Sequence, residues 1–275
     1  MQFREKVVLI TGGTAGVGLA CARSLRQLGA TVAVCGFEEP EFSSEQVDLA
    51  LFGDLVNDEF CQSVVSSVLD RFGRIDILVN SAGVGLYAAA SDSEPNDVRR
   101  LFDVNLFAML RMVQLVRPHM RAAAQGTIVN IGSIGGYVTL PWSTMYCVSK
   151  YAVHGLTEGL YRELRHEGIH VMLVVPGIVD TRFRENVIAG DVPAGVGAIR
   201  RVIKPEQLAA SIVKGIQYRR RKVTNPWLAY WFELANRLFP SAMDWYCARK
   251  WQPATEPTYT FDPVARNRMS RYPGQ

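Results

Sequence analysis

The chain has 275 residues, of which 48% are hydrophobic and 20% charged, so it has room for the core of one domain with a short appendage. Its 30 basic and 26 acidic residues leave a net charge of +4, and only residues 219–222 form a dense basic run, which argues against a nucleic-acid partner. The five cysteines are scattered without the spacing of a zinc site or a disulfide scaffold, which favours a reducing compartment.

Targeting and metal-binding signals are missing from the sequence. No segment reads as a signal peptide or a transmembrane helix, so we expect a cytoplasmic protein. The histidines His119, His154, His166 and His170 have no metal-like grouping, so we expect no metal site and predict that they lie on helix surfaces.

Short β-branched runs alternate with longer segments of helical apolar spacing. The runs occupy residues 7–10, 31–34, 75–79, 127–131 and 169–175. Their nearly continuous apolar character predicts strands covered on both faces. We therefore expect an α/β fold, a doubly wound parallel sheet of the Rossmann type, with ligands at the carboxyl ends of the strands. Residues 37–46 are too few for a full crossover helix, so that helix is expected to be reduced.

A glycine-rich turn, TGGTAGVG at residues 11–18, follows the first predicted strand and precedes a helical run. Glycines let the backbone approach a pyrophosphate, and the next helix offers free N–H groups and its positive dipole end. Glycines also serve ordinary tight turns. The position between strand and helix is therefore what favours a dinucleotide site.

This turn resembles the T-G-x-x-x-G-x-G signature of the short-chain dehydrogenase/reductase family. Further family marks follow in order, and they are Asp54-Leu55, N-S-A-G at 80–83, Asn105, Ser133, Y-x-x-x-K at 146–150 and Pro176-Gly177 with Thr181. Ser81 replaces the first alanine of the family's N-A-A-G. The resemblance implies a nicotinamide-dependent oxidoreductase acting on CH–OH groups.

The resemblance also implies the site residues. The catalytic tetrad would be Asn105, Ser133, Tyr146 and Lys150, in which Asn105 positions a water, Ser133 holds the substrate oxygen and Lys150 bonds the nicotinamide ribose. The cofactor contacts would be Gly12, Thr14, Gly16, Val17, Gly18, Gly36, Phe37, Asp54, Leu55, Asn80, Ala82, Gly83, Tyr146, Lys150, Pro176, Gly177, Val179 and Thr181.

The chemistry of Tyr146 and Lys150 also follows from their spacing. Side chains four residues apart lie on one face of a helix. Hydride transfer to a carbonyl leaves an alkoxide that needs a proton, and a phenol of pKa about 10 is a poor acid or base at neutral pH. A nearby ammonium stabilises the phenolate, so we expect Lys150 to lower the pKa of Tyr146.

The end of the second predicted strand sets the choice of nicotinamide cofactor. Gly36 occupies the usual Asp position of the family and Phe37 the usual Arg position, so neither pattern is followed. Glu38, Glu39 and Glu41 would repel a 2′-phosphate, which favours NAD(H) and leaves NADP as the alternative.

Residues 182–204 fall where the family has its substrate lid. The lid carries the apolar residues Val187, Ile188, Val192, Val196 and Ile199. They favour a hydrophobic ketone or secondary alcohol of steroid, retinoid or long-chain lipid type, although ordinary packing of the lid would also explain them.

The division of the chain is predicted as a nucleotide-binding and catalytic domain at 1–218 and a C-terminal helical extension and arm at 219–275. Asn225 is a candidate cap and Pro226 a candidate first residue of a helix whose broad apolar face comprises Trp227, Leu228, Trp231, Leu234, Ala235 and Leu238. With the basic run at 219–222, segment 226–239 could lie on an anionic membrane surface, cover the substrate pocket or form a subunit interface.

The oligomeric state and the alternatives to an enzyme complete the predictions. One side of the predicted helix that carries Tyr146 has the small residues Ala152, Gly155 and Gly159. The resemblance implies a homodimer or homotetramer whose subunits meet at this helix. A dinucleotide-binding protein without turnover and a membrane-surface scaffold are the alternatives to an enzyme.

Overall fold

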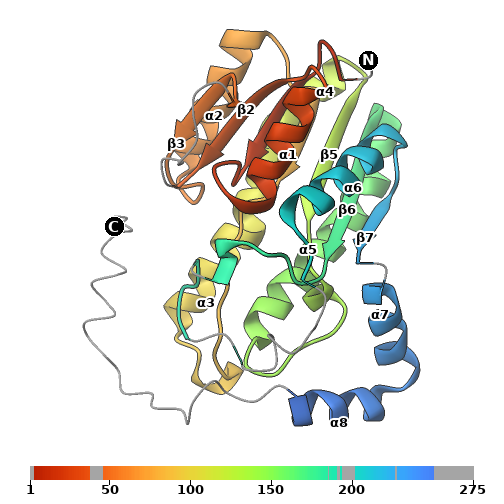
Figure 1. Ribbon diagram of the computed structural model, residues 1–275. Helices are drawn as coiled ribbons and strands as arrows, with labels where there is room; N and C mark the ends of the chain where they lie inside the picture. Colours follow the sequence, from red (N-terminus) through yellow and green to blue (C-terminus); the bar gives the residue numbers. More distant parts are fainter. Residues whose placement is uncertain are drawn as a thin grey trace.

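A seven-stranded parallel sheet in the order β3-β2-β1-β4-β5-β6-β7 organises the protein (Figure 1). The computed structural model describes residues 3–37, 46–184, 186–190, 193, 202–226 and 228–250. The strands are β1 Val7–Thr11, β2 Thr31–Gly36, β3 Leu49–Phe52, β4 Ile77–Asn80, β5 Gly126–Ile131, β6 Ile169–Pro176 and β7 Lys222–Asn225. The order reverses between β1 and β4, which is where a doubly wound sheet opens a ligand crevice at its carboxyl ends.

Helices cover both faces of this sheet and complete the predicted doubly wound fold. They are α1 Gly16–Gln27, α2 Asp58–Phe72, α3 Pro95–Phe102, α4 Ala108–Ala122, α5 Thr144–Leu164, α6 Pro205–Gln217, α7 Leu228–Leu238 and α8 Pro240–Lys250. Leu25 of α1 and Ile212 of α6 belong to one core cluster. Val64 of α2, Met112 of α4 and Leu160 of α5 belong to the other. The apolar runs predicted as two-sided strands are therefore buried from both sides.

The apolar runs predicted the five inner strands, β1, β2, β4, β5 and β6, but not the edge strands β3 and β7. β3 is only partly buried, and β7 has the polar sequence KVTN, so neither shows the apolar run of a central strand. β7 pairs with β6 through Val174 and Val223, so the sheet continues beyond residue 218, where the predicted domain boundary lies. Residues 38–45, which hold most of the predicted reduced crossover, lie outside the described residues.

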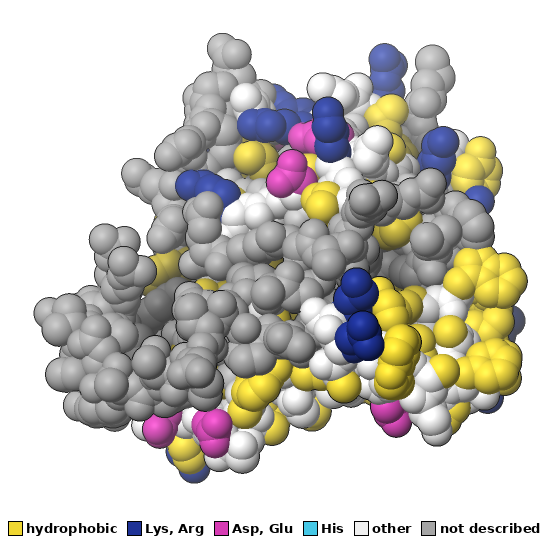
Figure 2. All heavy atoms as spheres, turned by 60° about the horizontal axis from the view of Figure 1, so that its bottom comes forward, with side chains coloured by type: hydrophobic (Ala, Val, Ile, Leu, Met, Phe, Trp, Pro, Cys, Tyr) yellow, Lys and Arg dark blue, Asp and Glu magenta, His cyan; other side chains and the backbone are white. Residues whose placement is uncertain are grey.

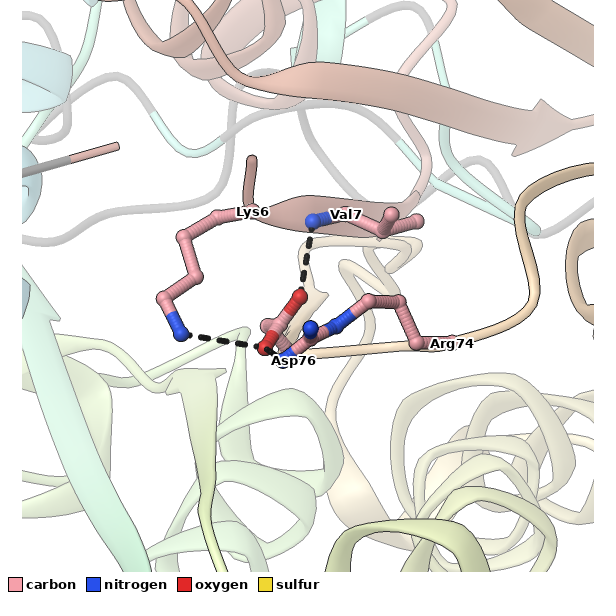
Figure 3. A network of polar contacts seen from close by, with 4 residues as sticks. All are labelled: Lys6, Val7, Arg74 and Asp76. Atoms are coloured by element: carbon pink, nitrogen blue, oxygen red, sulfur yellow. Dashed lines mark hydrogen bonds and ion pairs between the residues drawn. The ribbon is translucent and has the colours of Figure 1, made fainter. Parts of the chain in front are cut away.

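A buried carboxylate joins the amino ends of β1 and β4 (Figure 3). Asp76 accepts hydrogen bonds from the Val7 backbone N–H at 2.9 Å, from Lys6 Nζ at 3.2 Å and from Arg74 at 2.5 Å. Burial alone would raise the pKa of Asp76, but these donors outweigh it and lower the pKa. The network fixes the start of two central strands at the end of the sheet opposite the predicted ligand crevice.

The described part of the extension contains two helices after β7, where the sequence predicted one (Figure 1). Asn225 does not cap α7, because it ends β7 and donates from Nδ2 to Ser211 Oγ at 2.9 Å. The predicted apolar face is also divided, since Ala235 packs inward while Trp231 and Leu238 are exposed. No helix among the described residues is long and apolar enough to span a membrane.

Candidate active site

The glycine-rich turn forms a close-packed backbone cradle between β1 and α1. Gly12 and Gly16 have φ of 63° and 51°, a region that favours glycine. A Cβ on Gly18 would lie 2.2 Å from the Gly12 carbonyl oxygen, and one on Gly12 would lie 2.7 Å from Ala82 Cα. Such backbone shape, at the amino end of a helix, suits the close approach of a pyrophosphate.

Other predicted cofactor residues lie against this cradle. Thr14 contacts Gly36, where an added Cβ would meet Thr14 Oγ1 at 2.4 Å, and Thr181 contacts Gly16 in the same way at 3.2 Å. Ala82 N–H donates to Thr11 Oγ1 at 3.4 Å. The structure therefore brings the ends of β1, β2 and β4 and the segment after β6 to one place.

Two residues that are predicted to contact the cofactor have side-chain partners within the protein. Asp54 pairs with Arg100 at 2.6 Å and also accepts from the Val56 N–H, and Leu55 beside it is buried. Asn80 is buried and donates to Asn130 Oδ1 of β5 at 2.9 Å, so its side chain holds two strand ends together. The sequence does not reveal these partners.

The nicotinamide-end residues follow β6. Pro176 ends that strand, and the Gly177 N–H donates to the Asn225 carbonyl at 2.9 Å. Val179 forms an isolated bridge with Ile203, near the end of the predicted lid segment. Of the predicted lid, Val192, Val196 and Ile199 lie outside the described residues.

Tyr146 stands near the start of α5, opposite Ser133 after β5. Ser133 is buried, accepts from the Gly135 N–H at 3.0 Å and makes a hydrogen bond with Tyr146. Burial raises the pKa of Tyr146, and the Ser133 bond lowers it only in part. The pKa of Tyr146 is therefore raised, and the expected lowering by Lys150 is not seen, because the loss of hydration dominates.

Lys150 is the buried cation of the site. Its Nζ lies 5.8 Å from the centre of the Tyr146 ring and donates to the Ile131 carbonyl at 3.3 Å. Burial lowers the pKa of Lys150 to about 8, so the ammonium still predominates at neutral pH. The predicted Tyr–Lys pair thus shares one face of α5, with a positive charge behind the phenol.

Asn105 occupies a π-helical turn at Asp103–Phe107, between α3 and α4. Its fully buried side chain accepts from the Val84 N–H at 2.9 Å and donates to the Val84 carbonyl at 3.0 Å and to Ser149 Oγ at 3.1 Å. A Cβ on Gly83 would lie 3.2 Å from Asn105 Oδ1 and 3.6 Å from Lys150 Nζ. The four tetrad positions therefore lie close together, although they come from separate parts of the chain.

Comparison with known proteins decides the family. The short chain dehydrogenase family matches residues 6–191, more than half of the chain. The chain belongs to the short-chain dehydrogenase/reductase family. An uncharacterized oxidoreductase of Staphylococcus saprophyticus is 31% identical over 79% of this chain and 93% of its own length. A 3-ketodihydrosphingosine reductase of Bacteroides thetaiotaomicron is 34% identical over 67% of this chain and 68% of its own length.

A solved structure supports the same assignment. The 3-ketoacyl-(acyl-carrier-protein) reductase from Brucella melitensis, in complex with NADH, has a TM-score of 0.74 and 25% identity, covering 81% of this chain and 97% of that chain. This short-chain dehydrogenase is therefore an oxidoreductase with a nicotinamide dinucleotide cofactor. The Cβ-free cradle of the glycine turn fits that group.

Apolar and aromatic side chains surround the phenol of this dehydrogenase. The Phe183 ring lies 5.9 Å from the Tyr146 ring. A Cβ on Gly85 would meet Val187 at 3.0 Å, Tyr87 at 3.3 Å and Phe183 at 3.6 Å, so these three side chains gather at one point. Residues 186–189 run beside 85–87 through backbone hydrogen bonds, which carries part of the predicted lid to the site.

His154 lies next to Ser133 in the site, which the sequence did not predict. The prediction that it lies on a helix surface is wrong, as it is for His170 of β6, because both are buried. His154 Nε2 accepts a long hydrogen bond from the Ser133 N–H at 3.4 Å, and its ring packs on Tyr137 at 4.5 Å. Burial, helped by Lys150 and Lys222, lowers the pKa of His154 to about 4, so the imidazole is a neutral acceptor. Its position four residues after Lys150 on α5 was the sequence signal that could have placed it near the site.

Among the described residues no group of side chains could hold a metal ion.

Proposed function

We propose that this oxidoreductase moves hydride between NAD(H) and a hydrophobic ketone or secondary alcohol, with Tyr146 exchanging the proton. The observation that carries the proposal is the Tyr146 phenol, partly exposed, bonded to Ser133, with the buried Lys150 ammonium behind its ring. Few other roles explain a buried cation held against a phenol at the carboxyl ends of a doubly wound sheet.

In reduction, the carbonyl carbon gains a hydride and its oxygen gains a proton, so that C=O becomes H–C–O–H. The bound cofactor supplies the hydride. Ser133 Oγ donates a hydrogen bond to the carbonyl oxygen, and the Tyr146 hydroxyl gives its proton to the developing alkoxide. Lys150 stabilises the phenolate that this leaves. Oxidation runs the same transfers backward.

Burial of Tyr146 favours the neutral phenol, which is the form that reduction needs. The Lys150 charge matters once the proton has left, because it offsets the cost of a phenolate in a poorly hydrated place. Asn105 positions Lys150 through Ser149 and the Gly83 turn, since its side chain bonds Ser149 and lies against Gly83.

A hydrophobic substrate is supported by the surroundings of the phenol. Tyr87, Phe183 and Val187 present apolar surface beside Tyr146. A sugar would leave its hydroxyl groups unpaired against such walls, which costs free energy. The relative named 3-ketodihydrosphingosine reductase supports a ketone of lipid type.

NAD(H) is supported by the end of β2. Gly36 and Phe37 stand where the family pattern has an acidic or a basic residue, and the following sequence is acidic. A 2′-phosphate would meet like charge there.

A homodimer or homotetramer is supported by the outer face of α5 and of the π-helical turn at Asp103–Phe107. Phe107, Val148 and Tyr151 are exposed there, and a Cβ on Gly155 would meet nothing within 4 Å. This apolar, thin-sided face is suited to a symmetric helix contact.

A fluorescence titration with NADH and with NADPH tests the cofactor, and NADH oxidation with long-chain, steroid and sugar ketones tests the substrate class. We expect tighter binding of NADH and turnover with a long-chain or steroid ketone. Preference for NADPH would overturn the choice of cofactor, and turnover restricted to sugars would overturn the substrate class.

A further inference from the structure

An exposed apolar surface lies on the C-terminal helices. It consists of Tyr230, Trp231, Leu238, Phe239 and Trp245, each more than half exposed, and we call it the α7–α8 surface. Figure 2 brings this end of the molecule forward and shows hydrophobic side chains gathered along one border, with Lys and Arg side chains beside them. Large side chains gathered in this way mark an interaction site more often than scattered ones do.

The inner side of the same helices is already used for packing. Met243 and Cys247 of α8 are buried with Val138, and Phe232 and Ala235 of α7 pack against this cluster. Asn236 Nδ2 donates to the Tyr137 carbonyl at 3.3 Å. The α7–α8 surface therefore faces outward on helices anchored to the catalytic domain.

The charges around this surface are mainly positive. Arg237, Arg249 and Lys250 are exposed on α7 and α8, and Arg249 lies 5.5 Å from the centre of the Trp245 ring. Asp244 is an exposed acid, while Glu233 is paired with Lys222 at 2.9 Å.

The basic run at 219–222 adds little unpaired charge to this surface, because two of its residues are paired within the protein. It lies at the start of β7, whereas α7 follows the other end of that strand. Arg221 pairs with Glu158 of α5 at 3.3 Å, and Lys222 is the partner of Glu233.

We propose that the α7–α8 surface binds the surface of an anionic lipid bilayer. Trp and Tyr favour the boundary between headgroups and acyl chains, and neighbouring cations favour anionic headgroups. A two-fold contact between copies through this same surface would bring its cations together, which disfavours that occupant. If the protein acts as proposed above, the bilayer would also hold the hydrophobic substrate close to Ser133. The reason is that Asn236 of α7 bonds Tyr137, which lies four residues after Ser133.

Flotation of the full chain with vesicles tests the proposal without any substrate. The vesicles are phosphatidylcholine alone and phosphatidylcholine mixed with phosphatidylglycerol. We expect the protein to float with the mixed vesicles, and less so at high salt, where the headgroup attraction is screened. Trp231→Ser combined with Trp245→Ser should weaken binding about tenfold or more.

Leu28→Ser combined with Tyr218→Ser is the matched control, since both side chains are exposed on other helices or their ends. This variant should float like the unmodified chain. NADH binding by both variants shows that the fold is kept and separates this result from the proposed function.

Failure of the unmodified chain to float with mixed vesicles would overturn the proposal. So would equal flotation of the Trp231→Ser/Trp245→Ser variant. A smaller assembly of that variant by light scattering, without a change in flotation, would instead assign the surface to contact between copies.

Discussion

The nucleotide end of the sheet and the Ser133 loop are built in different ways. Around Gly12 and Gly18 the backbone itself makes the shape, and a single added methyl group would meet another backbone atom. Around Ser133 the geometry depends on side chains from several elements, among them His154 of α5 and Tyr137 of the loop. Mutations should therefore change cofactor binding and stability at the first region, and turnover and its pH dependence at the second.

At the nucleotide end the largest effect is expected from Gly18→Ala, because its Cβ would lie 2.2 Å from the Gly12 carbonyl oxygen. The free energy of unfolding should fall by about 1–3 kcal/mol. NADH affinity should fall about tenfold or more, as measured by fluorescence titration. Ser66→Ala, on the exposed face of α2, is the control, since it adds a methyl-bearing helix former away from the cradle. Its free energy of unfolding should change by no more than about 0.5 kcal/mol, and an equal loss in both variants would break the comparison.

Next in size is the pH dependence of turnover. Because burial lowers the pKa of Lys150 to about 8, its charge is present below that pH and lost above it. The kcat of ketone reduction should fall as the pH rises through about 8, by up to about tenfold per pH unit. Lys150→Arg should shift this fall to higher pH. An identical profile in the variant would show that Lys150 does not set it.

Asp76→Asn should lower the free energy of unfolding by about 1–2 kcal/mol, because a charged acceptor with three donors is replaced by an amide. The folded-state pKa of Asp76 is lowered, so its contribution is complete above its ordinary pKa and is lost as the pH falls through the lowered value. Urea unfolding at neutral and acid pH measures both effects. NADH affinity should not change, since this network lies at the far end of the sheet.

The smallest effect is expected from His154→Asn, which weakens the support of Ser133. We expect kcat to fall about threefold to tenfold, with little change in NADH affinity, because Ser133 N–H loses its imidazole acceptor at 3.4 Å. Lys214→Asn, at an exposed position of α6, is the control. A rise in KM alone would point to a different role.

His154 should also affect acid stability. The unfolded chain takes up a proton near the ordinary pKa of 6.5, which the folded His154 resists until about 4. The free energy of unfolding should therefore fall as the pH drops through that range, and His154→Asn should reduce the slope. His170, whose pKa burial also lowers, contributes to the slope in both proteins.

The sequence was sufficient for the features that repeat along the chain. Apolar runs such as residues 169–175 predicted the inner strands, and the glycine turn predicted the cradle at Gly12 and Gly18. The edge strand β7 was not predicted, because half of its surface has no partner strand and its residues are polar.

Long-range side-chain partners could not be predicted either. Nothing near Asp54 in the sequence points to Arg100, and the burial of Tyr146, which reverses the expected direction of its pKa, depends on the whole fold. The prediction that Asn225 caps a helix was wrong for a similar reason, because Asn225 is the last residue of the edge strand β7.

The most direct test of the account is NADH oxidation by the unmodified protein and by Tyr146→Phe, with a long-chain ketone as substrate. The phenyl ring keeps the packing against Phe183 and removes the hydroxyl, which is the proton donor and the partner of Ser133. We predict that kcat falls about 10²–10⁴-fold while NADH affinity stays within about twofold. Equal turnover by the two proteins would contradict the assignment of the proton to Tyr146.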